Sequence, residues 1–174
     1  VALILDGGPC PVGVESTIVS FLEEEPRLLR PGGVSLEEIE SIIGKVKISP
    51  IEEERPSAPG MLPKHYAPRT PIVLDWNGKN LDIYKGKKIG LLAFQETKNH
   101  LKFHFVEVLS KKGDIREAAA NLFAAIRRMD ALNLDLIVAE TIPEIGLGRA
   151  IMDRLRRASR GGPNSEELIK QSEI

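Results

Sequence analysis

The sequence has one cysteine, few aromatic side chains and no long apolar run. Cys10 is alone among 174 residues, so an internal disulfide and a multi-cysteine metal site are both excluded, as is usual in a reducing compartment. No apolar stretch approaches the roughly 20 residues of a membrane-spanning helix, and the start lacks the basic segment of a secretion signal. These absences predict a cytoplasmic protein with no membrane partner and no protein-bound metal.

An excess of charge of either sign is also missing. The formal net charge is −1, which gives the molecule no general attraction to nucleic acid, so we expect no stable direct contact with it. Hydrophobic residues make up 42% and charged residues 28%, proportions that are typical of a folded globular protein rather than a disordered one.

The sequence does not begin with Met. Residues 1–5 (VALIL) form an apolar run that ends at Asp6, and this run is typical of a strand. We expect a strand there. A start inside a strand indicates a piece of a longer protein.

The first part of the chain, residues 1–48, continues with an alternating stretch at 16–22 and a short strand at 27–30. A helix is predicted in "SLEEIESIIG", because Ser35 and Glu38 have the spacing of a capping box and the apolar residues that follow share one face.

Residues 49–70 are rich in proline and charge and have no periodicity, which predicts an extended linker. Beyond it, strand-like apolar runs occupy residues 72–74, 88–94, 104–108 and 134–141. An amphipathic helix at 114–132 lies between the last two runs, which indicates a mainly parallel sheet covered by helices.

The tail from Gly161 is poor in apolar residues and is typical of a disordered segment, although 165–170 has weak helical character.

Two loop and strand junctions carry polar side chains. Ser16 and Thr17 begin a β-branched run, where they either alternate as ordinary strand residues or present two hydroxyls to a polar ligand. Arg30 precedes a Pro-Gly-Gly turn, so its guanidinium either binds a phosphate or carboxylate or pairs with an acid among residues 23–25.

Within the linker, His65 and Tyr66 stand among prolines that hold the backbone extended. Plain spacers rarely contain such side chains. Tyr66 therefore either covers an apolar patch between domains or lies across a ligand.

Near the end of the globular part, "GLGRAIMDRLRRAS" contains Gly146 and Gly148, which hint at a phosphate-binding turn. Ile151 stands where the third glycine of that fingerprint is required. We expect instead a helix with Ile151, Leu155 and Ala158 packed on the sheet and its arginines solvated.

Three motifs together resemble the threonylcarbamoyl-adenylate synthase family in its two-domain form: "DGG…GVESTIVSF…LLRPGGVSLEEIE", "APGMLPKHYAPRTP" and "GLGRAIMDRLRRAS". The resemblance covers most of the chain. It implies that residues 1–48 end a YrdC-like α/β catalytic domain, that 49–70 are an interdomain linker or lid, that 71–160 are a Rossmann-like accessory domain, and that 161–174 are a tail. The family's catalytic domain is longer at its N-terminal side, so this sequence is similar to a C-terminal half.

The resemblance implies a nucleotidyltransferase reaction. L-threonine, bicarbonate and ATP with Mg²⁺ would give threonylcarbamoyl-adenylate and pyrophosphate, and other proteins would use the adenylate to modify a tRNA adenosine. Carried over by position, Ser16 and Thr17 would bind threonine, whereas Arg30, His65 and Tyr66 would bind ATP; no residue is assigned as catalytic. This piece alone would be inactive. The alternative is a noncatalytic α/β binding or interaction domain with an N-terminal arm.

Overall fold

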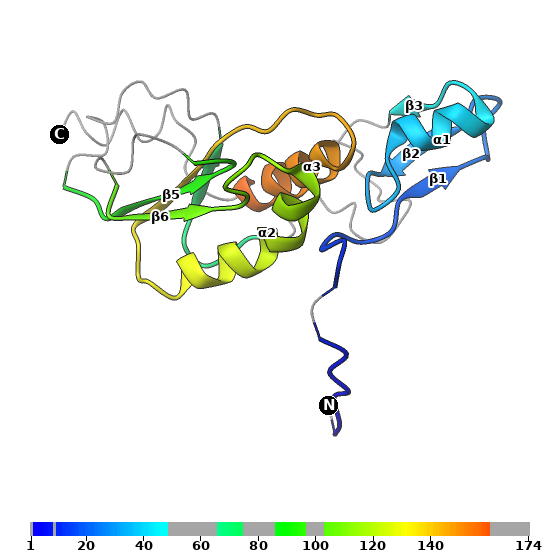
Figure 1. Cartoon of the computed structure of the whole chain (residues 1–174). Coiled ribbons are helices and arrows are strands. Elements are labelled where there is room, and N and C mark those ends of the chain that lie inside the picture. The colour runs from blue at the N-terminus through cyan, green and yellow to red at the C-terminus, as the bar shows by residue number, and fades with distance from the viewer. Residues whose placement is uncertain (1, 9, 49–65, 75–85, 97–102, 161–174) are drawn as a thin grey trace.

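The computed structural model describes residues 2–8, 10–48, 66–74, 86–96 and 103–160. Four short elements come first: β1 (Ile18–Ser20), β2 (Arg27–Arg30), α1 (Leu36–Ile43) and β3 (Lys47–Ile48). Six follow: β4 (Ile72–Leu74), β5 (Ile89–Ala93), β6 (Phe105–Val108), α2 (Ile115–Asp130), β7 (Leu136–Ala139) and α3 (Leu147–Ser159). Figure 1 shows them in two neighbouring groups.

The N-terminal group is a small sheet with one helix. β2 pairs antiparallel with β1 and parallel with β3, and a small core forms around Leu28, Leu36 and Val46. The predicted capping box of α1 is confirmed: the Glu38 amide donates to Ser35 Oγ at 3.2 Å, and the Ser35 amide donates to Glu38 Oε2 at 2.8 Å. β3 was not predicted, because two exposed residues carry no periodicity.

The strand expected at residues 1–5 is wrong for the described part of that run. Residues 2–5 have no regular secondary structure, and Leu3, Ile4 and Leu5 are 75%, 79% and 88% exposed. A strand needs a neighbouring strand to satisfy its backbone hydrogen bonds, and no described strand lies beside this segment. The alternating run at 16–22 is likewise reduced to the three residues of β1.

The C-terminal group contains a four-stranded sheet in the order β4-β7-β5-β6, and all its pairs are parallel. Every residue of β5 and of β7 is buried, as expected for central strands of a parallel sheet. The prediction of an α/β unit with a parallel sheet is therefore confirmed.

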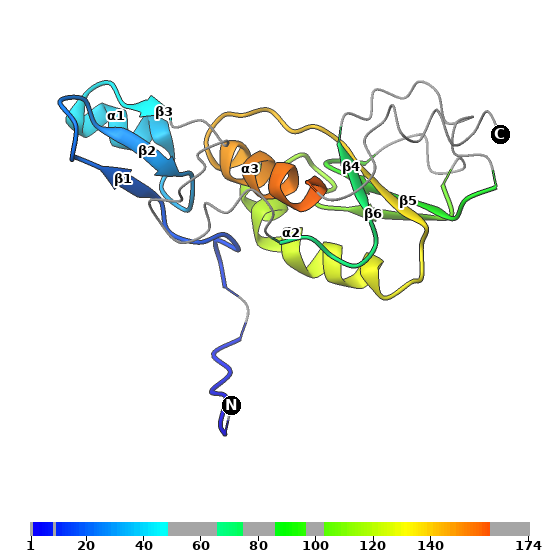
Figure 2. The ribbon, with the colours of Figure 1, turned by 180° about the vertical axis from the view of Figure 1, so that it is seen from behind.

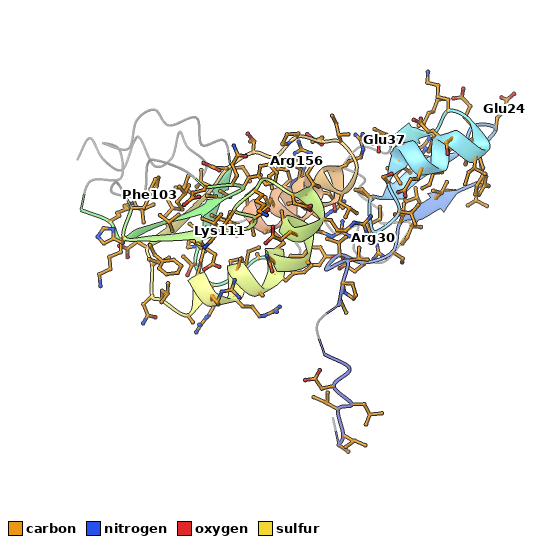
Figure 3. All side chains as sticks on the ribbon, viewed as in Figure 1. Glu24, Arg30, Glu37, Phe103, Lys111 and Arg156 are labelled. Carbon is orange, nitrogen blue, oxygen red and sulfur yellow. The ribbon has the colours of Figure 1, made fainter. Side chains whose placement is uncertain are left out.

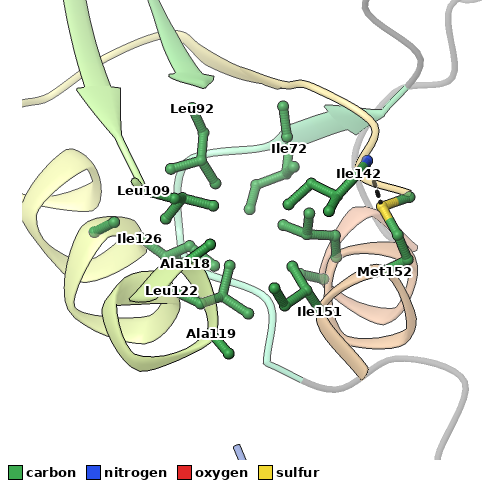
Figure 4. Packing of buried hydrophobic residues seen from close by; sticks show 14 of the residues in the cluster. Ile72, Leu92, Leu109, Ala118, Ala119, Leu122, Ile126, Ile142, Ile151 and Met152 are labelled. Carbon is green, nitrogen blue, oxygen red and sulfur yellow. Dashed lines mark hydrogen bonds between the residues drawn. The ribbon is translucent and has the colours of Figure 1, made fainter. Parts of the chain in front are cut away.

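Both described helices of this unit pack on the same face of the sheet. Side chains from α2 and α3 meet Ile72, Leu92 and Ile137 in one buried cluster (Figure 4). A smaller cluster, formed by Val73, Ile89, Leu136 and Val138, lies on the opposite face and contacts Phe103. α3 lies between the N-terminal group and the sheet, as both Figure 1 and Figure 2 show.

Asp114 caps the N-terminus of α2, and its carboxylate accepts the Glu117 amide at 2.9 Å. The helix predicted at 114–132 is confirmed. In α3, the expected burial of Ile151, Leu155 and Ala158 is also confirmed.

The expectation that the arginines of α3 are solvated is wrong for two of them. Arg154 is 0% exposed and Arg157 is 2% exposed. Both side chains pair with Asp153 of their own helix, and this compensates for the loss of water around their charges. Close packing requires glycine at position 148, because a Cβ there would lie 1.9 Å from the Pro143 carbonyl oxygen.

Most of the predicted linker and the whole predicted tail lie outside the described residues. The described end of the linker, residues 66–70, leads directly into β4. Among the described helices, none has the length and apolar character needed to cross a membrane.

Candidate functional site

The segment that precedes Ser16 is seated on the α/β unit. Val12 and Val14 pack against the cluster formed by α2 and α3. Gly13 has φ +72°, and a Cβ there would lie 2.3 Å from the Ala119 carbonyl oxygen. Only glycine fits so close to the helix in this backbone conformation. The C-terminal unit therefore supports the entry into β1.

The turn that follows Arg30 lies against the same segment. A Cβ on Gly32 would be 2.3 Å from the Glu15 carbonyl oxygen and 2.4 Å from the Ser16 carbonyl carbon. The Gly33 amide donates to the Glu15 carbonyl oxygen at 2.9 Å. The absence of side chains in this turn thus allows the start of β1 and the end of β2 to meet.

This meeting brings Ser16 and Arg30 together. The Arg30 guanidinium donates to the Ser16 carbonyl oxygen from Nε at 3.1 Å and from Nη2 at 2.9 Å, and Nη2 also donates to Ser16 Oγ at 3.1 Å. Arg30 is 8% exposed, whereas Ser16 is exposed. Figure 3 shows Arg30 near the boundary between the two groups of elements.

Two of the acids considered as alternative partners of Arg30 pair with other residues. Glu23 forms an ion pair with Arg27, and Glu25 forms one with Lys47. The geometry therefore favours the interpretation of Arg30 as part of a polar site over that of a surface ion pair with these acids.

Thr17 has a local structural contact. Its hydroxyl donates to the Val34 carbonyl oxygen at 2.5 Å and accepts the Val34 amide at 3.1 Å, which ties β1 to the residue before the cap of α1. A contact between Thr17 and threonine stays a prediction.

Tyr66 connects the end of the linker to both groups of elements. Its hydroxyl donates to Glu15 Oε1 at 2.5 Å, and its ring centroid lies 5.3 Å from that of Phe123 in α2. Tyr66 thus packs between the segment before β1 and α2. Packing was one of the two possibilities raised by the sequence, and a contact of Tyr66 with a nucleotide stays a prediction. His65 lies outside the described residues.

Arg154 completes this arrangement from α3. It donates to Glu15 Oε2 from Nε at 3.0 Å and from Nη2 at 2.7 Å, and its Nη1 donates to the Pro31 carbonyl oxygen at 2.9 Å. Its guanidinium carbon lies 5.5 Å from the centroid of the Tyr66 ring. Glu15, Tyr66 and Arg154 are hereafter called the Glu15 cluster.

The sequence indicated no role for Glu15, and it predicted that Arg154 is exposed to solvent when it is in fact buried. A signal for Arg154 was present, because it lies three residues after Ile151 and four before Ala158, on the helical face that is buried. For Glu15 no comparable pattern exists, since its partners are 51 and 139 residues away in the sequence.

The hydrogen bonds in this cluster change the acidity of two groups. Burial alone would raise the pKa of Glu15, but the hydrogen bonds from Tyr66 and Arg154 outweigh it and lower that pKa to about 2. Burial and the bond to the Glu15 carboxylate raise the pKa of Tyr66 to about 12. At neutral pH the cluster therefore contains a carboxylate, a neutral phenol and a guanidinium.

A second contact joins α3 to the N-terminal group farther from Ser16. Arg149 donates to Glu37 of α1 at 3.0 Å. Nearby, a cavity of about 90 Å³ lies between β2 and α3, and Arg156 and Arg157 on its wall pair with Glu144 and Asp153. Among the residues that the structure describes, no group of three or more His, Cys, Asp or Glu is arranged to hold a metal ion.

Comparison with known proteins places these observations in a family. The family described as "Threonylcarbamoyl-AMP synthase, C-terminal domain" matches residues 34–160. The chain belongs to the threonylcarbamoyl-AMP synthase family. The resemblance drawn from the sequence motifs is thereby confirmed.

Curated relatives agree with this assignment. The chain is 35% identical to the threonylcarbamoyl-AMP synthase of Bacillus subtilis over 171 residues, which cover 92% of this chain and 49% of the relative. It is 38% identical to that of Pyrococcus abyssi over 171 residues, which cover 90% and 48%. The chain thus spans about half the length of the curated relatives it matches.

A solved structure extends the likeness to three dimensions. The crystal structure of Sua5 from P. abyssi in complex with L-threonine superposes with a TM-score of 0.76 at 38% identity, and the match covers 89% of this chain and 48% of that one. A second structure of the P. abyssi protein, a variant with a histidine and a tyrosine replaced by alanine, gives a TM-score of 0.73 at 36% identity, with coverage of 89% and 47%.

Proposed function

We propose that this chain is part of an enzyme that forms L-threonylcarbamoyl-adenylate from L-threonine, bicarbonate and ATP, with release of pyrophosphate. The observation that most supports this proposal is that Ser16 Oγ and the Arg30 guanidinium lie 3.1 Å apart in a chain of the synthase family. The relative crystallised with L-threonine supports threonine as the amino-acid substrate.

The proposed reaction has two steps. The threonine amine adds to bicarbonate with loss of water and gives a carbamate. A carbamate oxygen then bonds to the α-phosphorus of ATP while the bond from that phosphorus to the pyrophosphate oxygen breaks. Such a transfer depends on the position of the reactants and on stabilisation of negative charge more than on a protein nucleophile.

Each residue of the site has a proposed task. Ser16, which is exposed, binds threonine with support from Thr17, whose own hydroxyl bonds to Val34 fix the local backbone. Arg30 places its positive charge beside the phosphates of ATP, and burial strengthens such an electrostatic contact. Mg²⁺ enters with ATP and neutralises phosphate charge, and we assign no residue of this chain to it.

Tyr66 and His65 are proposed to reach ATP from the linker, which then acts as a lid over the site. Tyr66 bonds to Glu15, the residue next to Ser16, and this position supports the proposal. We further propose that the enzyme acts in the cytoplasm and passes its adenylate to other proteins that modify tRNA, without stable binding to nucleic acid itself.

The role of Ser16 and Arg30 is tested in a two-domain protein that carries this chain. Threonine-dependent release of pyrophosphate from ATP is measured for Ser16→Ala and Arg30→Ala. We expect kcat/KM to fall roughly tenfold to a hundredfold, which corresponds to about 1 to 3 kcal/mol of lost binding in the transition state. For Arg30→Ala, the KM for ATP should rise.

Arg27→Ala is the matched control, because Arg27 lies on the same strand but pairs with the exposed acid Glu23. It should keep the activity of the parent. A parent that binds threonine and ATP but releases no pyrophosphate would support the noncatalytic binding domain instead.

Tyr66→Ala separates packing from ligand binding. Because Tyr66 contacts Glu15 and Phe123, we expect the free energy of unfolding of Tyr66→Ala to fall by about 1 to 3 kcal/mol. If Tyr66 also reaches the nucleotide, the rate per folded molecule falls as well. Normal turnover per folded molecule would limit Tyr66 to packing.

A further inference from the structure

Arg154 connects the C-terminal group of elements to the segments that bear the proposed substrate residues. We infer that Arg154 is a positioning residue, which holds Ser16 and Arg30 in the geometry that binds threonine and ATP. This inference rests on the proposed function.

The contacts of Arg154 flank both proposed substrate residues. Two of its nitrogens donate to the carboxylate of Glu15, which directly precedes Ser16. A third nitrogen donates to the carbonyl oxygen of Pro31, which directly follows Arg30. One rigid guanidinium therefore fixes the start of β1 relative to the turn after β2, from a helix of the other group of elements.

Compared with apolar side chains of similar size, these contacts are distinguished by the geometry that they fix rather than by added stability. Arg154 is fully buried, and its charge and that of Arg157 are matched by Glu15 and Asp153. A buried ion pair often adds no stability over apolar residues of similar size, because its desolvation offsets the attraction. The planar fork of donors, however, sets distances and angles that an apolar side chain leaves free.

Lysine cannot replace this arrangement in full. An ammonium group is a single point, so it can stay near the Glu15 carboxylate but cannot span that carboxylate and the Pro31 carbonyl as the guanidinium does. Arg154→Lys therefore retains the charge and loses much of the positioning.

Arg149 provides a matched control. It lies on α3, and it too forms an ion pair with the N-terminal group, at 3.0 Å from Glu37. Glu37 lies in the first turn of α1 and is adjacent to neither Ser16 nor Arg30. Arg149→Met thus removes a tether between the same two parts without a change next to the proposed substrate residues.

The experiment uses a two-domain protein that carries this chain, with the variants Arg154→Met, Arg154→Lys and Arg149→Met. Steady-state pyrophosphate release is measured against threonine and against ATP, and rates are expressed per folded molecule. For Arg154→Met we expect kcat/KM to fall at least tenfold, mainly through higher KM values for both substrates. Arg154→Lys should give an intermediate loss, and Arg149→Met should remain within twofold of the parent.

Amide hydrogen exchange at residues 15–17 and at Gly32 and Gly33 gives a second measurement that does not depend on activity. Exchange there should be faster by tenfold or more in Arg154→Met and unchanged in Arg149→Met. If Arg154→Met does not fold, Glu15→Gln replaces it: this variant weakens the same contact while an amide oxygen remains to accept a hydrogen bond, and the same direction of change is expected.

Unchanged KM values in an active Arg154→Met enzyme would overturn the inference, as would equal losses in the Arg154 and Arg149 variants. A parent without synthase activity overturns the proposed function instead. In that case unchanged amide exchange in Arg154→Met would show that Arg154 does not position Ser16 and Arg30. Faster exchange would show that it does, for whatever ligand these residues bind.

Discussion

At the scale of the residue, Glu15 is the acid on which the two parts of the chain converge. Its carboxylate accepts the Tyr66 hydroxyl on one oxygen and the Arg154 guanidinium on the other, and its carbonyl oxygen accepts the Gly33 amide. Each donor comes from a different segment, and the negative charge of the Glu15 carboxylate strengthens the two hydrogen bonds from Tyr66 and Arg154.

The low pKa of Glu15 predicts that the stability of the folded chain depends on pH. The pKa of Glu15 is about 2 in the folded chain and 4.5 ordinarily, so ionised Glu15 contributes its full stabilisation above about pH 5 and loses it as the pH falls towards 2. Glu15→Gln should be less stable than the parent at pH 7, and the difference should shrink between pH 5 and pH 2. Denaturant unfolding of both proteins across this range measures it; a difference independent of pH would contradict the low pKa.

The sequence predicted some of these interactions and not others. Ser35 and Glu38 could be predicted, since their interaction depends on local spacing alone. Ser16 and Arg30 were selected as candidates from their positions beside turns, and the structure does bring them together. The burial of Arg154 depends on partners far away in the sequence, and a local pattern of charge does not identify such partners.

At the scale of the element, the periodicity of apolar residues correctly predicted the helices and the buried strands, because it reflects which faces of an element are buried. The helix α2 buries one apolar stripe, and β5 and β7 are apolar throughout because both of their faces are covered. In α3 the burial extends beyond its apolar residues to Asp153, Arg154 and Arg157, which apolar periodicity does not predict. β3 was missed and a strand at residues 2–5 was wrongly expected, since strand formation at a sheet edge depends on whether a neighbour is present.

The contact between the loop before β1 and α2 yields a prediction for Gly13→Ala. Its Cβ would enter the backbone of α2 at 2.3 Å, and φ is +72°. We expect a loss of about 3 kcal/mol in the free energy of unfolding, from overpacking and backbone strain together. Urea unfolding followed by circular dichroism measures the change.

Gly8→Ala is the control for this variant. Gly8 has φ +83° but no neighbour within 4 Å of a Cβ, so only the backbone strain of about 1 kcal/mol applies. Equal losses in the two variants would mean that contact with α2 contributes nothing.

At the scale of the whole molecule, the proposed site depends on both groups of elements. Ser16 lies just before β1 and Arg30 ends β2, whereas α3 carries Arg154, and Tyr66 lies in the segment before β4. The C-terminal group therefore contributes to the proposed site as well as packing beside it. Neither group fixes the proposed site alone, because the contacts of Arg154 reach Glu15 and Pro31 from α3.

The last prediction concerns the 174-residue chain by itself. It spans about half the length of its curated relatives, and electrostatic stabilisation of a transition state depends on preorganised donors aimed at the charge that develops there. We therefore expect threonine-dependent pyrophosphate release from ATP to be slower than in a two-domain enzyme by on the order of a hundredfold or more. The assay compares the purified chain with a two-domain protein that carries it, at equal concentrations of folded protein. Turnover by the chain at a comparable rate would mean that these residues suffice for the reaction, and the expectation that this piece alone is inactive would then be wrong.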